Sequence, residues 1–177
     1  MKKIIPFLLL TFIAVNVLFS QNTQDSRSLE SFNKIRVIGK INTYVSHDTS
    51  FTAKISADGI ELADIITEVT DSTLTIKPGK GIHRDYSVDL YLSCGQIVDA
   101  YVKSGGRISF QDTLVAPSAT FTAGLNSSID ASVQLNSVEV ASENGGTVNL
   151  SGKTIQIKAR ARTGGTLSAL QLVTDTA

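Results

Sequence analysis

The feature that most constrains this chain is an internal repeat in its C-terminal half. Four short segments each carry a pair of small residues, and an apolar residue follows each pair within two positions. The four apolar residues are separated by 21, 19 and 19 positions; they are Ile108, Ile129, Val148 and Leu167. A fixed period near 20 residues, built from short alternating runs, is typical of a solenoid, in which each repeat packs only against its neighbours.

Apolar residues also align in the runs that precede the small pairs. Three columns result: Val98, Ala119, Val138 and Ile157; Ala100, Phe121, Val140 and Ala159; and Val102, Ala123, Ser142 and Ala161. We expect each repeat to hold two short strands, a small-residue corner and a return loop. Glycine suits the corner because the chain there needs unusual backbone angles or a close approach to the next coil. Stacked coils would lie about 4.8 Å apart, as paired strands do.

The region before the repeat also has the alternation of strands. Val88, Leu90 and Leu92 alternate with polar residues, and Asp71-Ser72 marks a tight turn inside another alternating run. A jelly-roll or up-and-down sandwich uses similar short strands and glycine turns, and it stays open as an alternative. The regular 19-residue offset favours the solenoid. The sequence therefore predicts a single all-β domain.

The N-terminus has the order of a secretory signal peptide. Lys2 and Lys3 precede an apolar run from Ile4 to Phe19, and a small residue, Ser20, is followed by polar residues. A retained membrane anchor is the alternative, but the run is short for a span. We predict a signal peptide at 1–20, a flexible lead-in at 21–31 and the β-domain at 32–177. The mature chain, without a membrane span, would reach the periplasm, the outer cell surface or the extracellular space.

Charge and residue types exclude several functions. Without the two leader lysines the chain has 14 basic and 16 acidic residues, so nothing favours binding to nucleic acid. His47 and His83 are the only histidines and read as loop residues, while Cys94 is the only cysteine and reads as buried. A nucleophilic triad or a zinc site needs clusters that this composition does not offer. The sequence predicts no enzyme activity, no catalytic residue, no metal and no cofactor.

One polar pattern runs through the repeat. Ser109, Asp130, Asn149 and Ser168 fall at equivalent places in successive coils, where they would form an outward ladder. Polysaccharide lyases and hydrolases on β-helices need clustered carboxylates, whereas the acids here are scattered. The ladder is therefore either a solvated sheet face or a surface that hydrogen-bonds sugars.

The run from Phe32 to Val45 resembles the opening motif of the putative auto-transporter adhesin, head GIN domain family, and Gly39, Ile41 and Asn42 match the letters of that name. The stretch 65–76 and the small-residue corners are also similar, so the resemblance covers about residues 29–172. It implies a right-handed parallel β-helix of the pectin-lyase type, exported and common in Bacteroidetes-like bacteria. It further implies adhesion through carbohydrate or another cell-surface partner, and it makes these three motif residues candidates for binding.

Two functions compete with adhesion. The first is an envelope structural protein or partner-binding scaffold without a small ligand, and the second is a carbohydrate-active enzyme. The C-terminal segment from Leu170 to Ala177 has no Pro, Lys or Arg, so we expect an exposed edge that self-associates by strand pairing. A basic stripe at Lys158, Arg160 and Arg162 would protect this edge only in part.

The signal peptide generates a direct prediction. We expect the exported protein to begin near Gln21, because Ser20 ends the apolar run with a small residue. N-terminal sequencing of the protein recovered outside the cytoplasm checks this. An intact Met1 terminus confined to the cytoplasmic fraction would contradict it.

Overall fold

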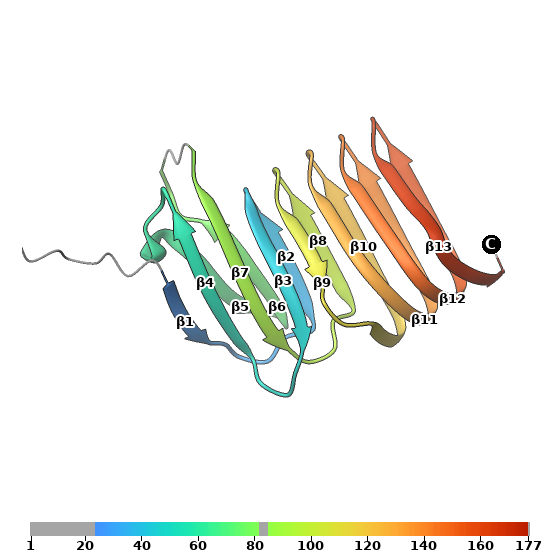
Figure 1. Cartoon of the computed structure of the whole chain (residues 1–177), viewed down its shortest axis with the longest axis horizontal. Coiled ribbons are helices and arrows are strands. Elements are labelled where there is room, and N and C mark those ends of the chain that lie inside the picture. Colours follow the sequence, from blue (N-terminus) through green and yellow to red (C-terminus); the bar gives the residue numbers. More distant parts are fainter. Residues whose placement is uncertain (1–23, 82–84, 177) are drawn as a thin grey trace, which may run out of the picture.

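One 13-stranded mixed sheet curls over itself to enclose the core (Figure 1). The computed structural model describes residues 24–81 and 85–176, so the predicted signal peptide lies outside the described residues. The strands are β1 (Gln24–Ser28), β2 (Lys34–Ile38), β3 (Ile41–His47), β4 (Thr52–Asp58), β5 (Ile65–Thr70), β6 (Thr73–Pro78), β7 (Ser87–Cys94), β8 (Asp99–Lys103), β9 (Arg107–Phe110), β10 (Leu114–Gly124), β11 (Ser128–Glu143), β12 (Thr147–Arg162) and β13 (Thr166–Thr176).

The sheet has two arms joined by long strands. The front arm runs β1-β4-β7-β3-β9, and the back arm runs β5-β6-β2-β8. The long strand β11 continues the front arm through β9, and β10 continues the back arm through β8. Strands β10 to β13 then pair in sequence order, all parallel. One described segment is helical, the single 3-10 turn Leu62–Asp64, and no described helix is long and apolar enough to span a membrane.

The predicted 19-residue register is confirmed where β11, β12 and β13 pair. Val148 lies opposite Ile129 on one side and Leu167 on the other, and Ile129 lies opposite Ile108. Val148 and Ile129 have no exposed surface. Equivalent residues of successive coils therefore form one interior column, as the repeat predicts.

A second corner in each long strand was not predicted. The ladder skips Pro117, Asn136 and Ile155, which are again 19 residues apart. In β11 the two successive residues Asn136 and Ser137 are exposed, while Leu135 and Val138 on either side are buried. This break shifts the period-2 alternation by one residue. The strand can therefore bend from the front arm to the back arm and keep its apolar side chains inside both.

The predicted small-residue corners are tight left-handed turns. Asn144 and Gly145 have φ angles of 51° and 79°, and Thr163 and Gly164 repeat this pair one coil later. The next residue is glycine because a Cβ on Gly146 would lie 2.2 Å from the carbonyl oxygen of Ala123. A neighbouring coil therefore fills the space that a side chain would need.

One coil solves the same crowding differently. Ser127 stands where the other coils have the third corner glycine, and its hydroxyl donates a hydrogen bond to the Val102 carbonyl at 3.0 Å. The alignment that the structure gives thus places Leu125 and Asn126, both at positive φ, on the left-handed turn. The 21-residue offset after Ile108 arises because this coil holds two more residues than the following ones.

The all-β, single-domain prediction is confirmed, but a purely parallel β-helix does not describe the N-terminal half. There β1 pairs with β4, β4 with β7, and β5 with β6, all antiparallel. The reason lies in short connections that reverse the chain instead of carrying it to the other arm. Asp71 and Ser72, with φ angles of 50° and 58°, form such a turn between β5 and β6.

The predicted flexible lead-in is wrong for residues 24–28, which form β1. Arg27 holds this strand in place. Its guanidinium donates hydrogen bonds to the carbonyl oxygens of Leu62 and Ile65 and pairs with the carboxylate of Asp25 at 2.8 Å. The hydrogen bond from Arg27 lowers the pKa of Asp25. Since Leu62 and Ile65 lie at the start of the back arm, Arg27 closes the N-terminal end of the core.

The interior column generates a stability prediction. Val148→Ala removes two methyl groups at a fully buried site and should lower the free energy of unfolding by about 1–3 kcal/mol. The matched control is Val115→Ala, because Val115 is 58% exposed and its change should cost less than about 0.5 kcal/mol. Chemical denaturation measures both. Equal losses in the two variants would contradict the packing described here.

Candidate ligand-binding face

Two columns of outward side chains cross the front arm and the first part of β11, β12 and β13. The tyrosine column consists of Tyr91, Tyr44, Ser109, Asp130, Asn149 and Ser168, each opposite the next in register. The arginine column consists of Asp89, Asn42, Arg107, Ser128, Thr147 and Thr166, aligned in the same way. We call the two columns together the ladder face.

Two stacked aromatic rings begin the tyrosine column. Tyr44 and Tyr91 have ring centroids 5.0 Å apart and ring planes 18° from parallel. Both point outward because their neighbours along the strand are buried, as Leu90 and Leu92 are around Tyr91. Tyr91 is 54% exposed. The pair therefore presents flat apolar surface to the solvent on an otherwise polar face.

Hydrogen bonds fix the polar groups of the ladder face. The Asn42 amide donates to the Asp89 carboxylate at 2.9 Å, and the Asn149 amide donates to the Asp130 carboxylate at 2.7 Å. The second oxygen of Asp130 forms an ion pair with Arg107 at 2.8 Å. In the part of the chain that the structure describes, no hydrogen bond engages the Oδ1 atoms of the two asparagines. These carbonyl oxygens are held in place and free to accept from a ligand.

The surface is hollowed at both ends of the tyrosine column. One hollow of about 610 Å³ lies beside Tyr91 and is lined by Lys54 and Ser56 of β4 and by residues of β1. The other, of about 460 Å³, lies over Asp130, Asn149 and Ser168. Both are open to solvent, so an elongated molecule could occupy them together.

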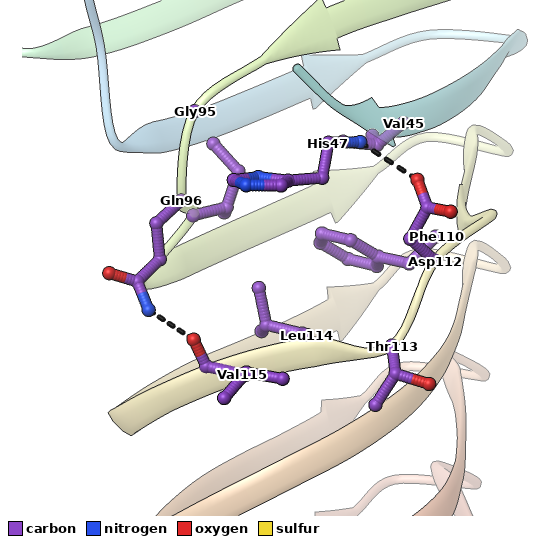
Figure 2. A pocket seen from close by; sticks show the side chains of 10 residues that line it. Val45, His47, Gly95, Gln96, Phe110, Asp112, Thr113, Leu114 and Val115 are labelled. Carbon is purple, nitrogen blue, oxygen red and sulfur yellow. Dashed lines mark hydrogen bonds between the residues drawn. The ribbon is translucent and has the colours of Figure 1, made fainter. Parts of the chain in front are cut away.

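A more enclosed hollow of about 360 Å³ lies between the ends of β3 and β9 and the start of β10 (Figure 2). Val45, Phe110 and Leu114 form its apolar walls, and His47 and Asp112 lie at its rim. The Asp112 carboxylate accepts a hydrogen bond from the backbone N–H of His47 at 2.9 Å. The hollow can seat a small apolar group, but it brings no thiol or serine hydroxyl to His47.

The chemistry of nucleophiles and metals finds no support in the described residues. They contain no group of three or more His, Cys, Asp or Glu side chains placed to hold a metal. Cys94 is buried at the end of β7, as predicted, and burial raises the pKa of its thiol to about 12. The reactive thiolate is therefore scarce at neutral pH. His83 lies outside the described residues.

The three motif residues have different surroundings. Gly39 has a φ of 103°, and a Cβ there would lie 2.8 Å from the Tyr86 hydroxyl, so this position needs glycine for backbone reasons. Ile41 belongs to the core and has no exposed surface. Asn42 alone reaches the surface, where it joins the arginine column. A direct contact to a ligand is therefore open to Asn42 and closed to Ile41.

The predicted polar ladder is confirmed, since Ser109, Asp130, Asn149 and Ser168 are successive register partners. Sequence reasoning missed that Tyr44 and Tyr91 extend it. The strand alternation was a signal that both point outward. Their adjacency had no signal, because β3 and β7 are far apart in the chain and lie outside the 19-residue repeat.

Comparisons with known proteins agree with this fold. Similar solved structures include an adhesin, described as putative, from Bacteroides fragilis, with 16% identity, a TM-score of 0.71, and coverage of 85% of this chain and 72% of that chain. Another from Parabacteroides merdae has 14% identity, a TM-score of 0.62 and coverage of 86% and 74%. A structure from Parabacteroides distasonis described as a putative lipid binding protein has 13% identity, a TM-score of 0.57 and coverage of 86% and 76%.

These identities are low, so the solved structures show a shared fold and no shared ligand. A comparison with curated proteins finds no match. The sequence matches the family described as "Putative auto-transporter adhesin, head GIN domain" over residues 31–177, which is nearly all of the described part. The chain therefore belongs to the head GIN domain family of putative auto-transporter adhesins.

Proposed function

We propose that this domain is an exported, non-enzymatic adhesion module whose ladder face binds carbohydrate at the cell surface. The observation that carries the proposal is that the stacked pair Tyr44 and Tyr91 continues directly into a column of serine, aspartate and asparagine side chains. A sugar ring has apolar C–H faces and hydroxyl groups around its edge. Flat aromatic rings suit the faces, and paired carboxylate and amide groups suit the hydroxyls.

The rigidity of the face supports weak but specific binding. Asp89 and Asp130 are held by neighbouring amides and by Arg107, so a ligand would not have to order them. A binding site that is ordered beforehand loses little side-chain entropy on binding. Each hydrogen bond to a ligand contributes about 0.5–1.5 kcal/mol net, so single contacts are weak and several must act together. Weak contacts of this kind suit an adhesin, which gains strength when many copies bind one surface.

The architecture predicted from the repeat belongs to the same proposal. The parallel pairing of β10 to β13 at a constant offset supports a solenoid for this half of the domain. We propose that it has the right-handed, pectin-lyase-like form that the resemblance implies. The solenoid would present the ladder face as a long, regular surface.

The glycan hypothesis predicts that the tyrosines are required. On a glycan array we expect Tyr44→Ala and Tyr91→Ala each to weaken binding by about tenfold, since an aromatic contact contributes roughly 0.5–1.5 kcal/mol beyond its buried area. The matched control is Tyr101→Ala, because Tyr101 is an outward tyrosine of the back arm that contacts Arg36. Binding lost equally in all three folded variants, or no glycan bound by the native protein, would contradict the proposal.

The open edge of β13 favours a second candidate, a partner-binding scaffold without a small ligand. Strand β13 pairs only with β12, and within Thr166–Thr176 it has no Lys, Arg or Pro to discourage further pairing. Leu170 is 96% exposed and Val173 is 62% exposed. We propose that two copies pair their β13 strands antiparallel, an isologous contact that would cover both side chains.

Self-association can be measured by size-exclusion chromatography with light scattering on residues 24–177. We expect a concentration-dependent dimer, which Leu170→Lys combined with Val173→Lys should convert to monomer, because charges on an edge strand oppose strand pairing. Val115→Lys is the control, since Val115 is an exposed valine away from this edge. A native protein that stays monomeric at high concentration, with amides 166–176 protected from hydrogen exchange, would contradict the edge contact.

A further inference from the structure

We infer that the ladder face binds a linear, neutral oligosaccharide that lies along the stacking direction of the strands, with about one sugar ring per strand. This inference rests on the proposed function. It adds the shape, the direction and the charge class of the ligand.

The direction follows from the register. The tyrosine column crosses β7, β3, β9, β11, β12 and β13, and these strands lie side by side along the long axis of the domain (Figure 1). Paired strands are about 4.8 Å apart, so the column from Tyr91 to Ser168 is about 24 Å long. One strand spacing is close to the advance of one pyranose ring in an extended glycan. A linear chain along the column would therefore meet an equivalent side chain at each ring.

The distribution of groups along the column also favours a chain over a single sugar. The aromatic rings lie at the β7 end, while Asp130 and Asn149 lie three and four strands further on. Each end has its own hollow, one beside Tyr91 and one over Asn149 and Ser168. One sugar ring can reach only a single end. A ligand that uses the stacking surface and the hydrogen-bonding groups together has to span several strands.

The charge class follows from the balance on the face. Asp89 and Asp130 are its acids, and Arg107 together with Lys54 of the neighbouring strand β4 supplies the bases. Arg107 is already paired with Asp130. A chain of uronic acids would bring negative charge close to two carboxylates and find one unpaired cation, Lys54, at one end. A neutral chain avoids this repulsion and can still accept and donate hydrogen bonds along the column.

The arrangement predicts a dependence on chain length. Affinity should rise from the disaccharide to the hexasaccharide by at least tenfold and should then level off, because six strands carry the column. A neutral chain should bind at least tenfold more tightly than a uronic acid chain of the same length.

The test uses the mature chain and an array of neutral and uronic acid oligosaccharides, each from disaccharide to octasaccharide. Neutral chains whose affinity rises and levels off support the inference. Affinity that does not change with length, or a preference for the uronic acid chains, overturns it and leaves carbohydrate binding intact. An array on which nothing binds overturns the proposed function itself.

Two variants locate the chain on the face. Asn149→Ala should weaken hexasaccharide binding at least fivefold while disaccharide binding changes less than twofold, because the disaccharide can stay on the tyrosines. Asn136→Ala is the matched control, since Asn136 is an exposed asparagine at the bend of β11, off the ladder face. Thermal unfolding confirms that both variants fold. Equal effects of Asn149→Ala on short and long chains would overturn the extended placement.

Discussion

The rest of this structure depends on the in-register parallel pairing of successive coils at a constant offset. Backbone hydrogen bonds between β10, β11, β12 and β13 hold the coils together, and the corner residues set how closely the coils approach. At Gly146 and Gly165 a side chain would collide with a carbonyl oxygen of the preceding coil. The small residues are therefore a condition for the pairing distance, and the columns inside and outside the domain follow from it.

This register produces the core and the candidate site together. Because side chains alternate along a strand, the register that aligns Val148 with Ile129 also aligns Asn149 with Asp130. The bend in each long strand shifts the alternation once, so both arms turn apolar residues inward. The two ends of the domain differ. Arg27 covers the N-terminal end with hydrogen bonds to the back arm, whereas β13 leaves Leu170 exposed at the other end.

The chemistry of the ladder face suits recognition rather than catalysis. Its carboxylates are held by amides and by Arg107 in fixed positions, and its tyrosines add flat apolar surface beside them. The groups that catalysis would need are placed otherwise: Cys94 is buried, and His47 lies at the rim of a hollow with apolar walls. A rigid array of weak contacts gains affinity through ligand length and through the number of copies, which is the property expected of an adhesin.

The sequence by itself determined whatever the repeat or the strand alternation encodes. The column of Ile129, Val148 and Leu167 and the polar ladder were predictable, because equal offsets place equivalent residues opposite each other in a stack. Contacts outside the repeat were decided only by the tertiary structure. The antiparallel strands, the position of β1 under Arg27 and the stacking of Tyr44 on Tyr91 join segments of unrelated spacing. No local pattern encodes such partners, since they depend on which strands the curled sheet brings side by side.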